Sequence, residues 1–159
     1  PWSGRLLNRR KDGRPYVVME RLEGKDLGHS SWLEVSQDRI NVFADATDDH
    51  QYIHVDPVRA KDSPFGGTIA HGFLTLSLYI PMWSEILEVT DASTLVNYGT
   101  DKVRFVSPVP AGSRIRLNAV LTTVAEVKGG YQLHVAGTIE LEGNERPAVV
   151  VESISRVYA

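Results

Sequence analysis

The segment ATDDHQYIHVD, residues 46–56, concentrates side chains that can exchange protons or bind a metal ion. They are three carboxylates and two of the five histidines of the chain: Asp48, Asp49, Asp56, His50 and His54. Carboxylates and imidazoles are the usual partners in general acid–base catalysis, and both also coordinate metals. The segment is therefore the first candidate for an active site, and a polar loop without a chemical role is the alternative.

A metal site built on His50 and His54 requires a helix, because their spacing of four residues places them on one face only there. Zinc proteases with this spacing carry a glutamate directly after the first histidine, where this chain has Gln51. The β-branched residues of the segment and the following Pro57 disfavour a helix. We therefore predict a loop here, with no metal ligands and no metal or organic cofactor.

A second motif supports the active-site interpretation. The stretch SPFGGTIAHGF, residues 63–73, breaks the chain with glycines just before its most apolar run. The AHGF part places backbone N–H groups, including that of Gly72, at the start of a predicted buried helix, where they can polarise a carbonyl oxygen. An acid–base pair that faces such a donor is a recognisable active-site arrangement.

Periodicity predicts the elements that must hold these residues. Residues 32–36 are rich in β-formers and predict a short strand. Ser36 then caps a predicted helix with one apolar face. That face carries Ile40, Phe43, Ala44 and Thr47. The candidate segment follows as a loop, and Pro57 starts a short helical turn.

The remaining chain predicts the larger elements of the fold. Residues 69–80 carry no formal charge and are apolar nearly all round, which predicts a buried helix. Pro81 kinks or ends this helix, and residues 82–89 continue it. The second half predicts about four long antiparallel strands, with a hairpin turn at Gly129 and Gly130. The expected class is therefore α+β, with one buried helix on a curved sheet.

The length and composition of the chain argue against several classes of function. The length of 159 residues predicts a single domain over 1–159, with 1–26 as an N-terminal extension. A net charge of −3 without a basic block argues against nucleic acid as a partner. The absence of cysteine excludes disulfides and thiol nucleophiles and suits a reducing cytoplasm. The most apolar run is too short to span a bilayer, so we predict no membrane partner.

Two segments resemble a known family. FADATDDHQYIHVDPVRAKDSPFGGTIAHGFLTLSL, residues 43–78, is similar to the signature of the MaoC-like (R)-specific enoyl-CoA hydratases. NYGTDKVRFVSPVPAGSRIR, residues 97–116, resembles the nodulation-protein-N-like subgroup of dehydratases. The two motifs occur in the family's order and at its separation, and the resemblance extends over residues 27–158.

The resemblance implies a hot dog fold, in which a long central helix is wrapped by a curved antiparallel sheet, and a homodimer with a joined sheet. It implies hydration of a 2-enoyl thioester of CoA or acyl carrier protein to the (R)-3-hydroxyacyl product, or the reverse dehydration. The family's catalytic pair falls on Asp49 and His54, and its backbone oxyanion donor on Gly72. Gln51 matches the amide residue between the pair, and His71 either lines the pocket or packs at the helix start.

Asp48 departs from the family, which commonly has Gly before the catalytic Asp. If its carboxylate lies near the pair, its charge raises the pKa values of Asp49 and His54. Asp48→Gly would then move the pH–activity profile to lower pH. If Asp48 only caps the turn, the profile stays unchanged and the substitution costs modest stability.

Two other functions remain open. A hot dog thioesterase would use the same scaffold with a carboxylate elsewhere, and the spacing of Asp49 and His54 argues against it. A non-catalytic subunit that binds acyl thioesters or acyl carrier protein would keep the motif without turnover. Outside the pair, His50 is expected at the loop rim and Asp56 as a cap.

Overall fold

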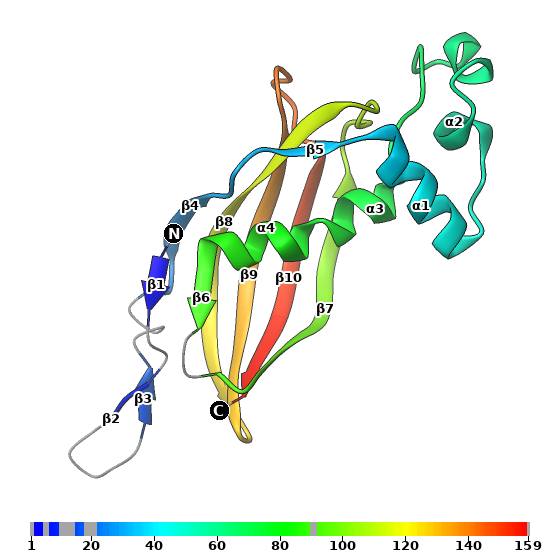
Figure 1. Ribbon diagram of the computed structural model, residues 1–159. Helices are drawn as coiled ribbons and strands as arrows, with labels where there is room; N and C mark the ends of the chain where they lie inside the picture. The colour runs from blue at the N-terminus through cyan, green and yellow to red at the C-terminus, as the bar shows by residue number, and fades with distance from the viewer. Residues whose placement is uncertain (1, 5–6, 10–14, 18–21, 90–91, 159) are drawn as a thin grey trace.

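A computed structural model of the protein describes residues 2–4, 7–9, 15–17, 22–89 and 92–158. Its main feature is a curved sheet in the order β4–β8–β9–β10–β7, with β5 also paired to β8 (Figure 1). The strands are β4 Lys25–His29, β5 Leu33–Val35, β7 Thr94–Phe105, β8 Ser113–Val127, β9 Gly130–Leu141 and β10 Val149–Tyr158. All pairings within this sheet are antiparallel. The α+β class and the four long strands are therefore confirmed.

Three short strands precede the sheet. They are β1 Trp2–Gly4, β2 Leu7–Arg9 and β3 Pro15–Val17. β1 runs parallel to β6, Leu87–Val89, and β2 pairs with β3. The main sheet begins at Lys25, close to the end of the predicted extension. The division of the chain into one domain and an extension stays a prediction.

Helix α1, Gln37–Thr47, forms where the apolar periodicity predicts it. The Ser36 hydroxyl accepts a hydrogen bond from the Arg39 N–H at 3.3 Å, which confirms the predicted N-cap. Ile40 and Ala44 are fully buried and Phe43 is partly buried, so most of the predicted apolar face packs inward, whereas Thr47 is exposed.

The central helix is divided in two, α3 Gly72–Ser77 and α4 Tyr79–Ile86, which lie across one face of the sheet (Figure 1). The break falls at Leu78 and not at the proline. Pro81, in the first turn of α4, has no N–H to offer the carbonyl of Ser77, so the interruption appears one turn before it. The predicted position of the kink, Pro81, is therefore wrong, and the break lies at Leu78 instead.

Both ends of the predicted helix also differ. The amide of Ile69 donates to the carbonyl of Ile53 at 3.0 Å, so this residue lies in extended chain and the helix begins at Gly72. After Ile86 the chain leaves the helix and forms β6. In both places a pairing with a distant segment replaces the local helical bonds that apolar periodicity alone would predict.

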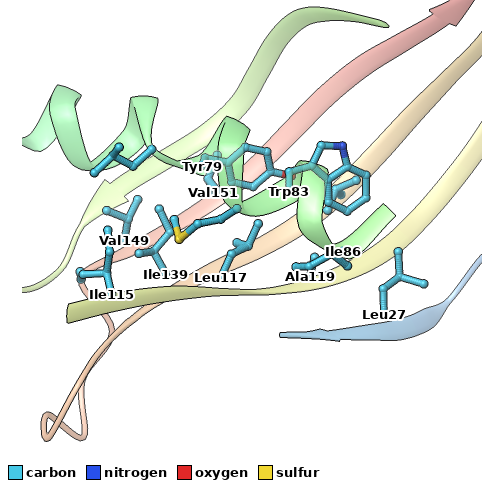
Figure 2. Packing of buried hydrophobic residues seen from close by; sticks show 14 of the residues in the cluster. Leu27, Tyr79, Trp83, Ile86, Ile115, Leu117, Ala119, Ile139, Val149 and Val151 are labelled. Atoms are coloured by element: carbon cyan, nitrogen blue, oxygen red, sulfur yellow. The ribbon is translucent and has the colours of Figure 1, made fainter. Parts of the chain in front are cut away.

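The buried face of the sheet packs against α4, and Figure 2 shows side chains at this boundary. They come from α4 (Tyr79, Trp83, Ile86), β8 (Ile115, Leu117, Ala119), β9 (Ile139) and β10 (Val149, Val151). Gly137 alternates with the buried Val135 and Ile139 along β9, and a Cβ atom on it would approach the ring of Tyr79 to 2.8 Å. A glycine here therefore allows the helix to lie close to the strand.

The β8–β9 hairpin turns at Lys128 and Gly129, one residue earlier than predicted, and Gly129 has φ +83°. This left-handed conformation suits glycine in a short hairpin turn. Within the described part of the chain, no helix is long and apolar enough to cross a membrane.

Candidate active site

The candidate segment leaves α1 through a left-handed residue. Asp48 is the C-cap of α1 with φ 58° and ψ 21°, and among the described residues it is the one non-glycine with a positive φ. This conformation is the usual helix-ending geometry, and it favours glycine because of crowding at Cβ. It turns the chain so that the carbonyl of Asp49 lies 2.9 Å from Nε2 of His71.

We expect Asp48→Gly to raise the free energy of unfolding by about 0.5–1 kcal/mol, because glycine adopts a positive φ without crowding. The sequence alone predicted that Asp48→Gly would cost modest stability if Asp48 only caps the turn. The positive φ of Asp48 instead predicts a gain. Urea unfolding of the two proteins measures the change.

The same substitution should leave the pH–activity profile unchanged. The charge of Asp48 acts on His50, whose pKa it helps to raise, whereas the titratable neighbours that shift the pKa of His54 are His71 and Asp49. A profile of kcat/KM that moves to lower pH in Asp48→Gly would show that Asp48 is coupled to the catalytic pair.

His54 is carried by a short helix, α2 Tyr52–Val55, where a loop was expected. The carbonyl of Gln51 accepts the His54 N–H at 2.9 Å and the Val55 N–H at 3.4 Å, which closes one helical turn. Pro57 then ends it, because the residue before a proline is pushed into extended conformation, and Asp56 has φ −116°. One turn is short enough to form despite the β-branched residues.

The His54 side chain is buried, with 7% exposed, and its Nδ1–H donates to the carbonyl of Ile69 at 2.7 Å. This bond selects the neutral tautomer in which Nε2 carries a free lone pair. Burial lowers the pKa of His54, the bond to Ile69 opposes that shift, and the nearby His71 adds to it. The ring is therefore held neutral and ready to accept a proton at Nε2.

Gln37, at the start of α1, supports the backbone of His54. Its Nε2 donates to the His54 carbonyl at 2.7 Å, and its Oε1 accepts from the Thr68 hydroxyl at 2.5 Å. One side chain thus joins α1, α2 and the segment before α3. Sequence reasoning missed Gln37, because the first residue of an amphipathic helix carries no signal that distinguishes it from a surface position.

His71 joins Asp49 and His54 into one cluster. It is 3% exposed, and its ring stacks on that of His54 with centroids 3.8 Å apart and an interplanar angle of 27°. Its Nε2 also lies 4.0 Å from Oδ2 of Asp49, whose side chain is half exposed. The structure therefore brings Asp49, His54 and His71 together, as the candidate residues require.

Gly72, the first residue of α3, lines the same cavity as His54. The cavity has a volume of about 300 Å³, and Thr75, Phe105 and Val109 also line it. A Cβ atom on Gly72 would lie 3.1 Å from the ring of Phe105, so glycine leaves room here. The first N–H groups of a helix have no acceptor inside it, and none lies near the Gly72 N–H among the described residues.

The other polar residues of the segment lie outside the cluster. His50 is exposed and bonds through Nε2 to Oδ1 of Asp45 at 2.9 Å, a hydrogen bond that raises its pKa. It therefore makes no pair with His54, and the rim position expected for it is confirmed. Gln51 is exposed and is the N-cap residue of α2, and its side chain does not line the cavity.

The carboxylate of Asp56 accepts hydrogen bonds from the Val58 N–H at 3.1 Å and the Arg59 N–H at 2.9 Å. These bonds cap the 3₁₀ turn η2, Arg59–Asp62, that follows Pro57. The capping role expected of Asp56 is confirmed, and it leaves this acid without a part in the cluster.

The cluster has the residue types of a metal site, since ligand atoms of Asp49, His54 and His71 all lie within 4.8 Å of one another. A metal bonds to the lone pair in the plane of an imidazole, and two nearly parallel rings cannot both point such a lone pair at one ion. His54 Nδ1 and His71 Nε2 are also bonded to backbone carbonyls. The geometry suits proton transfer better than metal binding.

Comparison with known proteins shows which family and which proteins the chain is similar to. The MaoC like domain family matches residues 18–144. The chain is 47% identical to 3-hydroxyacyl-thioester dehydratase Z of Mycobacterium tuberculosis over 137 residues, which cover 86% of this chain and 91% of that protein. It is 48% identical to Nodulation protein N of Rhizobium leguminosarum bv. viciae over 136 residues, or 83% of this chain and 84% of that one.

A solved structure shows the same fold at low identity. The unliganded R-hydratase PhaJ1 of Pseudomonas aeruginosa superposes with a TM-score of 0.69 at 18% identity, covering 86% of this chain and 81% of the other. The hot dog arrangement expected from the sequence, a central helix wrapped by a curved antiparallel sheet, is confirmed.

Proposed function

The chain belongs to the MaoC-like dehydratase family, and we propose that it hydrates a 2-enoyl thioester to the (R)-3-hydroxyacyl thioester or catalyses the reverse dehydration. One observation carries the proposal: a neutral imidazole with a free Nε2 and an unpaired backbone N–H line one cavity, and a carboxylate oxygen of Asp49 lies within 4.8 Å of that imidazole. The names of the relatives, a 3-hydroxyacyl-thioester dehydratase among them, support the reaction class.

The separation within the pair suits a shared water. A carboxylate oxygen of Asp49 and a ring nitrogen of His54 are at most 4.8 Å apart, and two hydrogen bonds of about 2.8 Å that meet at a tetrahedral angle span about 4.6 Å. In hydration, the pair takes one proton from water as its oxygen bonds to C3 and delivers one proton to C2. His54, held neutral, can accept the first proton, although the coupled pair shares its titration.

Gly72 would stabilise the charge that develops on the thioester oxygen. As C3 is attacked, the thioester becomes enolate-like, and its oxygen gains negative charge. A backbone N–H fixed at the start of α3 can donate to that oxygen without moving. Each group therefore has one task, and no metal or organic cofactor enters the proposal.

The substrate we propose is a thioester of CoA or of an acyl carrier protein. The cysteine-free composition suits the reducing cytoplasm, which we propose as the location. Two basic side chains suited to CoA phosphates, Arg114 and Arg116, are paired with Glu142 and with Glu140 of β9. They thus occupy a charged strand face in this structure.

The test is hydration of crotonyl-CoA, followed as loss of enoyl absorbance, with and without a chelator. We expect turnover that the chelator does not reduce. Release of free CoA thiol without hydration would instead indicate a thioesterase. Binding of the thioester without any turnover would indicate the non-catalytic subunit, and either result would overturn the proposal.

We also predict a homodimer. β7 lies at one edge of the sheet, so an edge is open to a second copy. Exposed apolar side chains follow it: Leu95, Val96, Tyr98 and Phe105. Light scattering at micromolar concentration should give twice the monomer mass, and Leu95→Lys should weaken the dimer. A monomer mass for the wild type contradicts this prediction.

A further inference from the structure

We propose that His71 is a positioning residue that holds both members of the acid–base pair, through a hydrogen bond to Asp49 and a ring stack on His54. This inference rests on the proposed hydration, because it concerns the positioning of the two groups that would transfer protons. Proton transfers to and from one water succeed only when the two groups keep their separation.

The hydrogen bond anchors the backbone of Asp49 from the buried side. His71 Nε2–H donates to the Asp49 carbonyl at 2.9 Å, across 22 residues of sequence. Among the described residues, no other hydrogen bond reaches Asp49, whose side chain is 55% exposed. The carboxylate is thus free to meet substrate, while its backbone is anchored from the buried side.

The stack restrains the other partner. His71 lies against His54 with centroids 3.8 Å apart, and Phe43 contacts His71 with centroids 5.0 Å apart. The His54 ring is therefore held at Nδ1 by Ile69 and on its face by His71. Together these contacts leave the imidazole little freedom to rotate Nε2 away from the cavity.

His71 itself is not arranged to exchange protons with substrate. Because Nε2 donates to a carbonyl, the neutral ring has its lone pair on Nδ1, which is buried without a partner among the described atoms. A proton on Nδ1 would find no acceptor there. The contacts of His71 thus serve Asp49 and His54, and His71 acts through them.

Three substitutions separate the two contacts. His71→Gln retains an N–H donor near the position of Nε2 but loses the ring, His71→Phe retains the ring but loses the donor, and His71→Ala loses both. We expect kcat to fall roughly 10²-fold in His71→Ala, with KM within about twofold of wild type, since misplacement by about 1 Å has such an effect. His71→Gln and His71→Phe should each recover part of the loss.

The control is His50→Ala, which removes an exposed histidine of the same segment and should leave kcat unchanged. Circular dichroism and the unfolding midpoint are measured for every variant. A kcat within twofold of wild type in folded His71→Ala overturns the proposal. So does an equal loss in all three variants that parallels their loss of stability, because that pattern is structural.

A measurement without turnover keeps this inference distinct from the proposed function. In ¹⁵N-histidine spectra of the wild type at neutral pH, His71 should be protonated at Nε2 and His54 at Nδ1. A His71 proton on Nδ1 would refute the positioning role whatever the activity. The predicted tautomers in a protein inactive on crotonyl-CoA would overturn the hydratase proposal and leave the contacts of His71 established.

Discussion

Asp49→Asn and His54→Asn are each expected to lower kcat/KM for enoyl thioester hydration by about 10²–10⁴-fold, the usual contribution of a general acid or base. Asparagine at 49 keeps the size of the side chain but cannot accept a proton. At 54 its amide N–H can replace the Nδ1–H that binds the Ile69 carbonyl, while Nε2 is removed. Both variants should therefore stay folded.

Matched controls lie in the same segment. Asp48→Asn changes the neighbouring carboxylate and His50→Asn the neighbouring imidazole, and neither side chain reaches the cluster. Both should keep nearly full activity. Since Asp49 and His54 act as a unit, the double variant should be little worse than either single one. Near-wild-type turnover in a folded Asp49→Asn or His54→Asn protein would exclude the assignment.

The pH profile follows from the direction of the His54 shift. Burial lowers the pKa of His54, so the ring stays neutral to a lower pH than an exposed histidine, whose pKa is about 6.5. Hydration that needs the neutral ring should persist through neutrality and decline only below that value. A profile whose acid limb lies above pH 7 would contradict the neutral tautomer seen here.

Gly72→Pro is expected to lower kcat by about 10²–10³-fold relative to Gly72→Ala, the range found when one oxyanion donor is removed. Gly72 is the first residue of α3, a position that proline tolerates, and His71 before it has the extended φ −58° and ψ 140° that proline requires. The substitution therefore removes the N–H with little change to the backbone.

Gly72→Ala is the matched control, because it adds a Cβ and keeps the N–H. Both variants place a carbon 3.1 Å from the Phe105 ring and should share any loss caused by that contact. The comparison thus isolates the hydrogen-bond donor. Equal kcat values in the two folded variants would show that the Gly72 N–H does not stabilise the transition state.

Much of this site can be read from local sequence. The spacing of Asp49 and His54, the AHGF motif at a helix start and the Ser36 cap are short-range patterns, and the structure places each of them as expected. Local patterns succeed here because caps, turns and apolar faces depend on neighbours within one or two helical turns.

Three other features of the fold differ from what the local sequence pattern predicts. Ile69 leaves the predicted helix because its amide pairs with Ile53, and the kink moves to Leu78 because Pro81 withholds a hydrogen bond. The one-turn helix that carries His54 formed against the β-branched residues around it. The partner of Ile69 lies outside the predicted helix, whereas the break at Leu78 and the one-turn helix arise because nearby backbone groups lost or gained a partner.

The residue types and their spacing were enough to predict the candidate acid–base pair, the candidate N–H donor and the α+β class. The surroundings of the pair required the tertiary structure: His71 reaches Asp49 across 22 residues and Gln37 reaches His54 across 17. The burial that lowers the pKa of His54 and the left-handed backbone of Asp48 are likewise properties of the folded chain. The side-chain types determine which chemistry is possible. The distances between these side chains, their exposure and their tautomers are set only when remote segments pack together.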